Sequence, residues 1–146
     1  MNGNDLDDSV FDDLYIFKKP SAEKDWVIIF VDHANMFYNL KELNVRIDYE
    51  KFKELLTRDR HLVAAVIYMG LMSRLTPKKI GFLEYLRSAG FIILSRPVRR
   101  TPNGRDYQKG IDTYIYSDIL ELTLGDHCDV AILVSGDEDF RSIIPR

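Results

Sequence analysis

Short apolar runs that stop abruptly at polar residues dominate the hydrophobic pattern of this chain. Four such runs cover residues 26–31, 62–69, 91–94 and 130–134. Runs of this length are typical of strands buried on both faces of a parallel sheet. Between them, apolar residues recur at helical spacing, as at Ile115, Ile119 and Leu122. Strands that alternate with helices predict an α/β domain with helices on both faces of the sheet.

The expected helices carry recognisable start and stop signals. Asp48 is a candidate N-cap for the second helix, and Thr76 followed by Pro77 starts the third, which Gly90 ends. Gly125 ends the fourth helix, and Asp139 can cap a last one. The residues expected to face inward on the first three helices are Phe37, Leu40 and Leu43, then Phe52, Leu55 and Leu56, then Ile80, Leu83 and Leu86.

The segments outside these elements divide the chain. Residues 1–25 predict an acidic, flexible tail, and residues 26–146 a single domain. Residues 95–109 contain Pro97, Pro102 and Asn103-Gly104, which predict a long basic loop. Because a sheet of this type usually has a fifth strand, we expect four or five strands, and either a domain truncated at its carboxyl terminus or a minimal domain.

Composition narrows the class of protein. The chain has 146 residues, enough for one domain that buries about 70% of its unfolded surface. It has one cysteine, Cys128, and no apolar run of the roughly 20 residues that span a bilayer. We therefore expect a cytoplasmic protein without a membrane partner. His33, His61 and His127 are expected at the surface.

The charge is unevenly distributed although the net charge is only −3. Residues 1–25 hold seven acidic residues and three lysines. Residues 73–109 hold nine basic residues and two acidic ones. A solvated surface is the plain interpretation of this basic segment, whereas a phosphodiester substrate such as RNA is the functional one.

Carboxylates follow two of the predicted strands. Asp32 ends the first strand and Asp137 follows the fourth. If the strand order is the doubly wound 3-2-1-4, these strands are neighbours, and their carboxyl ends form the edge where ligands of such sheets bind. Mg²⁺ or Mn²⁺ binds oxygen ligands and needs few carboxylates. The pattern predicts a site for such an ion.

The helix that begins near Gly110 offers two further acids, Asp112 and Asp118. Six residues rotate a side chain by about 240° and move it by about 9 Å, so both acids cannot bind one ion directly. Asp118 borders the apolar stripe of its helix and should be half-buried, which is costly without a partner. We expect Asp118 to be a ligand and Asp112 to lie at the rim.

Other residues near the expected site have two interpretations each. Asn35 could orient the attacking water, and Tyr107 could stack on a base. Asp32, Asn35 and Asp139 could instead cap helices, and Ser135 could support a tight turn rather than contact substrate. The candidate substrate-binding residues are Lys109, Arg74, Arg100, Arg105, Tyr107 and Ser135.

Three motifs give the chain a family likeness. Val31-Asp32-His33-Ala34-Asn35-Met36, Lys109-Gly110-Ile111-Asp112 and Val134-Ser135-Gly136-Asp137-Glu138-Asp139-Phe140 resemble the NYN domain, the LabA-like branch of the PIN nuclease superfamily. The resemblance implies a Rossmann-like PIN fold and metal-dependent cleavage of RNA. It assigns the acidic positions to Asp32, Asp112 and Asp137, and the wider PIN pattern also fits Asp118. His33 stands where the family usually has glycine.

The leading hypothesis is a Mg²⁺- or Mn²⁺-dependent ribonuclease that cleaves single-stranded or structured RNA internally. The catalytic set is Asp32, Asp112, Asp118, Asp137 and Asn35, with Asp139 as a further metal ligand. The alternative is a catalytically inactive PIN-like module that binds RNA or a protein. A Toprim-like enzyme ranks lower because enzymes of that superfamily have glutamate at the end of the first strand, where this chain has Asp32. The absence of glycine from residues 32–35 disfavours a dinucleotide site. A homodimer stays open.

Overall fold

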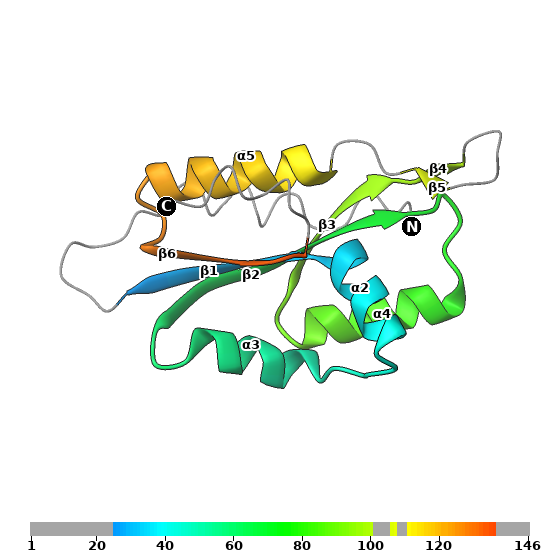
Figure 1. Cartoon of the computed structure of the whole chain (residues 1–146), viewed down its shortest axis with the longest axis horizontal. Coiled ribbons are helices and arrows are strands. Elements are labelled where there is room, and N and C mark those ends of the chain that lie inside the picture. Colours follow the sequence, from blue (N-terminus) through cyan, green and yellow to red (C-terminus); the bar gives the residue numbers. More distant parts are fainter. Residues whose placement is uncertain (1–24, 101–105, 108–110, 137–146) are drawn as a thin grey trace.

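The core of the protein is a four-stranded parallel sheet. In the computed structural model, which describes residues 25–100, 106–107 and 111–136, the strand order is β3-β2-β1-β6 (Figure 1). The strands are β1 (Trp26–Asp32), β2 (His61–Leu71), β3 (Ile92–Pro97) and β6 (Val130–Val134). Counted along the sheet strands alone, this is the predicted order 3-2-1-4. The α/β fold is therefore confirmed.

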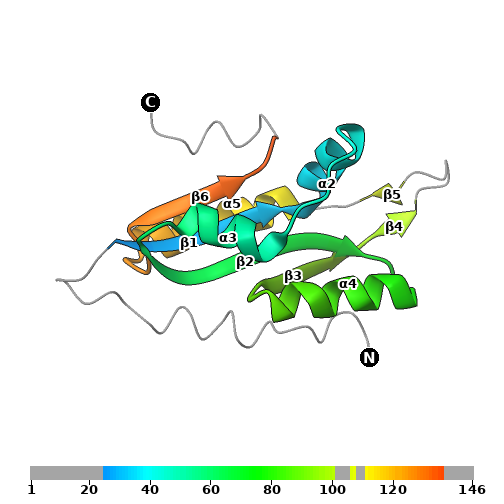
Figure 2. The same cartoon turned by 90° about the horizontal axis from the view of Figure 1, so that it is seen from below.

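Helices cover both faces of the sheet. α5 (Ile111–Leu124) lies on one face, and α2 (His33–Glu42), α3 (Tyr49–Thr57) and α4 (Pro77–Ser88) lie on the other (Figures 1 and 2). Alternate residues of each strand point to opposite faces, so the core has two parts. Ile29 and Val31 of β1 pack toward α2–α4, whereas Ile28 and Phe30 pack toward α5.

The helix starts follow the predicted capping residues. The Asp48 carboxylate accepts a hydrogen bond of 3.1 Å from the backbone N–H of Lys51, and the Thr76 hydroxyl accepts one of 3.2 Å from that of Lys79. Both satisfy amides that have no partner within the helix. After α4, Gly90 adopts φ = +89°, a conformation that glycine reaches without steric cost.

Several side chains expected in the core are exposed. Phe37 is 48% exposed and Leu55 is 71% exposed, and Leu43 and Ile80 are exposed as well. Each helix on this face is short and lies on the sheet through a narrow stripe. Leu40, Leu56, Leu83 and Leu86 occupy that stripe, so the neighbouring apolar positions point away from it.

The basic segment after the third strand is more regular than expected. β3 extends to Pro97, and the expected loop contains two short strands, β4 (Arg99–Arg100) and β5 (Asp106–Tyr107). They pair antiparallel, with Arg99 opposite Tyr107. The strands were not predicted because the Asn103-Gly104 dipeptide indicates a loop, although it also favours hairpins.

The remaining expectations have mixed outcomes. Cys128 is buried, and His127, which was expected at the surface, is buried as well. The acidic tail, apart from Asp25, and the last helix lie outside the described residues. Within the described part of the chain, no helix has the length and apolar character needed to cross a bilayer.

Candidate active site

Asp32 lies at the carboxyl end of β1 and is only 4% exposed. β1 and β6 are parallel neighbours whose last register pair is Val31 with Val134, so the next residues on each strand, Asp32 and Ser135, meet at the sheet edge. The Ser135 hydroxyl donates a hydrogen bond of 3.0 Å to Oδ2 of Asp32. Ser135 was a candidate substrate contact, and the structure gives it a role in holding Asp32.

Asp118 lies on α5 and is more deeply buried than expected, at 6% exposure. The Tyr68 hydroxyl donates a hydrogen bond of 2.7 Å to Oδ2 of Asp118. Burial of a carboxylate is costly unless hydrogen bonds or a cation compensate it, so this contact explains part of how Asp118 is accommodated. Tyr68 was not among the predicted site residues, because its sequence signal is one hydroxyl within an otherwise apolar strand.

Asp32 and Asp118 lie on the same face of the sheet. Asp32 continues the alternation of Ile28 and Phe30, which pack toward α5. Tyr68 is the register partner of Asp32 on β2, and its hydroxyl reaches Asp118 on α5. Two buried carboxylates and two hydroxyl donors, from four separate segments, therefore gather at the α5 side of the carboxyl edge.

Asp112 is separated from this group as the helix geometry predicts. It lies in the first turn of α5 and is exposed, whereas Asp118 faces the sheet. Carboxylates in the first turn are favoured by the partial positive charge of the helix amino terminus. Asp112 is thus more exposed than Asp118, and its place at the rim of the site stays a prediction.

The donor set suits a hard divalent cation. Mg²⁺ is commonly held by one or two carboxylates together with water, and Asp32 and Asp118 offer oxygen donors only. Within residues 25–100 and 111–136, no three His, Cys, Asp or Glu side chains form a group that could hold a metal. Asp137, the predicted third acid, directly follows Gly136 and lies outside the described residues.

The other candidates divide between described and undescribed parts of the chain. Arg74 is exposed in the connection between β2 and α4. Asn35 lies in the first turn of α2, Arg100 in β4 and Tyr107 in β5, but their side chains are not described. The candidates that lie wholly outside the described residues are Asp139, Arg105 and Lys109.

His33 was expected at the surface, but it is buried beside Asp32. Its ring lies 5.7 Å from that of Phe37 and 5.5 Å from that of Phe82, on the face opposite α5. Burial, together with the positive charge of Lys79, lowers the pKa of His33 to about 4. His33 is therefore neutral near pH 7. Among the described residues, its Nε2 atom has no hydrogen-bond partner.

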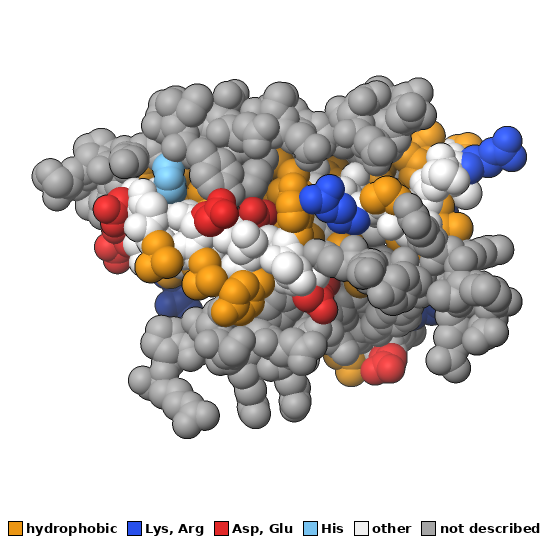
Figure 3. Space-filling view, turned by 90° about the horizontal axis from the view of Figure 1, so that it is seen from above, with side chains coloured by type: hydrophobic (Ala, Val, Ile, Leu, Met, Phe, Trp, Pro, Cys, Tyr) orange, Lys and Arg blue, Asp and Glu red, His pale blue; other side chains and the backbone are white. Residues whose placement is uncertain are grey.

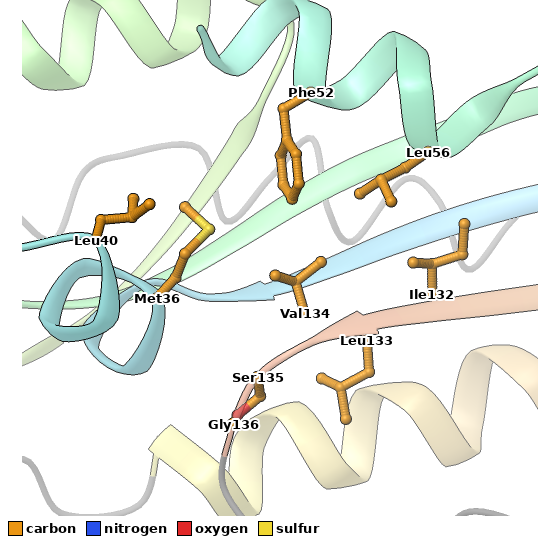
Figure 4. Close-up of a pocket in the computed structure, with 9 residues that line it drawn as sticks. All are labelled: Met36, Leu40, Phe52, Leu56, Ile132, Leu133, Val134, Ser135 and Gly136. Carbon is orange, nitrogen blue, oxygen red and sulfur yellow. The ribbon is translucent and has the colours of Figure 1, made fainter. Parts of the chain in front are cut away.

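An apolar groove of about 480 Å³ reaches the same edge from that opposite face. Figure 4 shows Met36, Phe52, Leu56 and Val134 turned toward one another between α2, α3 and β6, while Leu133 points toward α5. The groove ends at Ser135 and Gly136. The two faces of β6 thus differ, with an apolar groove on one and the carboxylates on the other.

Comparison with known proteins agrees with this architecture. The family model for the NYN domain matches residues 27–146. The chain is also similar to a protein of unknown function from Vibrio parahaemolyticus, whose crystal structure aligns with a TM-score of 0.70 and 31% sequence identity. That alignment covers 86% of this chain and 75% of the other. No curated protein matches the sequence.

Proposed function

The chain belongs to the NYN domain family, within the PIN-like nucleases, and from this premise we propose that it is a metal-dependent ribonuclease that cleaves RNA internally. The observation that carries the proposal is the pair of buried carboxylates, Asp32 and Asp118, at the carboxyl edge of the sheet. They come from segments far apart in the sequence and share one face. Ordinary helix capping does not account for that convergence.

Asp32 and Asp118 would hold the metal, with Asp137 as the third acid and Asp112 and Asp139 at the rim. When bound, Mg²⁺ or Mn²⁺ polarises a phosphoryl oxygen and makes its bound water a better nucleophile. The geometry of the carboxylates depends on the two hydroxyls that bind them. Ser135 fixes Oδ2 of Asp32, and Tyr68 fixes Oδ2 of Asp118.

The basic residues of the chain would bind the substrate. We assign phosphate contacts to Arg74, Arg100, Arg105 and Lys109, and base stacking to Tyr107. Asn35, on the first turn of α2, would orient the attacking water or the Asp32 carboxylate. The neutral, buried ring of His33 supports the start of α2 by packing and takes no proton from the water.

One observation favours the alternative, an RNA-binding module without turnover. Each buried carboxylate already accepts a hydrogen bond from a protein hydroxyl, so its burial is partly compensated without a cation. For the nuclease and for the RNA-binding module alike, a cytoplasmic location and a homodimer stay predictions.

Cleavage of labelled RNA separates the two functions. We expect cleavage in Mn²⁺, none in EDTA, and a loss of at least about a hundredfold in Asp32→Asn and Asp118→Asn. Asp126→Asn is the matched control because Asp126 is exposed and has φ = +60°, which asparagine tolerates equally well. Wild-type rates in the Asp32 and Asp118 variants would refute the nuclease proposal. RNA binding without cleavage by the unmodified protein would support the module.

A further inference from the structure

Arg96 and Tyr114 form a stacked pair near the candidate site. Arg96 is exposed near the end of β3, and its guanidinium carbon lies 4.0 Å from the centre of the Tyr114 ring on α5. This distance is short for a cation–π contact, which places the guanidinium over the ring. Neither residue was among the candidates of the sequence analysis.

The pair is connected to the buried acid through one further ring. Tyr114 meets Tyr68 edge-on, with ring centres 6.1 Å apart and an interplanar angle of 81°. The Tyr68 hydroxyl in turn holds Asp118. Consecutive contacts therefore lead from the exposed Arg96, across the half-buried Tyr114, to the carboxylate group.

Basic and acidic side chains both lie on this side of the molecule. Figure 3, seen from the α5 side, shows Lys or Arg side chains near the middle and at the end that carries β4 and β5, and acidic side chains toward the left end and near the middle. Arg96 directly precedes Pro97 and Val98, after which β4 adds Arg99 and Arg100. Among the side chains that the structure describes, no carboxylate forms an ion pair with Arg96.

A guanidinium stacked by its face keeps its N–H donors along its edges. Those donors match the paired oxygens of a phosphate, and stacking reduces the freedom that a long side chain would lose on binding. A lysine at this position would supply the positive charge but no planar group that could stack on the ring. The stacked geometry is thus suited to a phosphate held at a defined place.

We propose that Arg96, positioned by Tyr114, binds a backbone phosphate of single-stranded RNA next to the phosphodiester at Asp32 and Asp118. The proposal rests on the proposed function only in taking RNA as the ligand. Arg96 is the contact residue, and Tyr114 is a positioning residue. The strand would pass from the β4–β5 end of the molecule toward the carboxylates.

The test measures binding of fluorescein-labelled decauridylate by fluorescence anisotropy in EDTA, where no cleavage occurs, over a series of KCl concentrations. Arg96→Gln should weaken binding about fivefold at low salt and reduce the slope of log K against log[KCl] by about 0.7, as expected for one lost phosphate contact. Arg58→Gln is the matched control. Arg58 is exposed just before β2, at the opposite edge of the sheet, and its substitution should change neither quantity.

Further variants separate the contribution of the stacking contact to RNA binding from that of the positive charge. Arg96→Lys should keep the salt slope but bind more weakly, because the charge stays and the planar fork is lost. Tyr114→Phe should bind normally, whereas Tyr114→Leu should bind more weakly at an unchanged salt slope. Thermal unfolding shows whether each variant is folded. Equal affinities of the Phe and Leu variants would overturn the positioning role of Tyr114.

The outcomes also separate this inference from the nuclease proposal. If Arg96→Gln and Arg58→Gln bind alike, or if the unmodified protein does not bind the RNA, the inference is wrong, whatever the cleavage assay gives. If Arg96→Gln lowers affinity and the salt slope while Mn²⁺ supports no cleavage, the phosphate site stands and the nuclease proposal fails.

Discussion

Substitution of Tyr68 by phenylalanine removes a single oxygen from the centre of the site. The Tyr68 side chain is 1% exposed, and its ring lies 6.5 Å from that of Phe30 and 6.1 Å from that of Tyr114. Phenylalanine fills the same space in the same packing. The change therefore tests the 2.7 Å hydrogen bond to Asp118 with little effect on the rest of the core.

The expected loss follows from the charge and burial of the acceptor. A hydrogen bond to a charged group contributes about 1.5–3 kcal/mol, and a carboxylate that stays buried keeps its desolvation cost. We expect the free energy of unfolding of Tyr68→Phe to fall by about 2 kcal/mol. For a domain of this size, that loss lowers the Tm by about 4–8 °C.

Urea unfolding and calorimetry in EDTA at neutral pH measure this effect. Tyr116→Phe is the matched control, because Tyr116 is an exposed tyrosine on α5 and its hydroxyl is expected to contribute less than about 0.5 kcal/mol. A double-mutant cycle with Asp118→Asn isolates the pair. If Tyr68→Phe is as stable as the wild type, or if the cycle shows no coupling, the assigned role of Tyr68 is wrong.

Two further predictions concern the core and its response to pH. His33 has a folded-state pKa of about 4 against an ordinary 6.5, so the unfolded chain binds more protons between these values, and stability should fall as the pH drops from 6.5 toward 4. His33→Phe should remove about 2 kcal/mol of pH dependence between pH 7 and pH 5, as measured by urea unfolding at both values. An unchanged pH profile would show that His33 is not buried neutral. Leu122 is fully buried, so Leu122→Ala should lower the free energy of unfolding by about 2–5 kcal/mol. Leu124 is 81% exposed, and Leu124→Ala should lower it by less than about 0.5 kcal/mol. Equal losses in chemical denaturation would contradict the described packing of α5.

Local patterns in the sequence were sufficient to predict the fold. The apolar runs of β1 and β2 are buried on both faces and that of β6 is half-buried throughout, and their composition identifies all three as strands of a parallel sheet. Asp48 and Thr76 cap their helices through contacts three residues away, which are visible in the sequence. Leu55 and Ile80 were misplaced because helical spacing identifies apolar positions without showing how wide the contact stripe is.

The candidate site was only partly predictable, because its contacts join distant segments. Asp32 and Asp118 were found from strand ends and helix spacing. Their hydroxyl partners, however, are 103 residues away for Ser135 and 50 residues away for Tyr68. The surroundings of His33 depend on Phe82 of α4, and no local pattern indicates that a histidine after a strand will be buried between aromatic rings.

A crystal soaked in MnCl₂ and measured at the manganese absorption edge tests the central claim most directly. We predict an anomalous peak at the carboxyl edge of the sheet, with carboxylate oxygens of both Asp32 and Asp118 within about 2.5 Å. A peak that has neither acid as a ligand, or no peak at saturating manganese, would contradict the account.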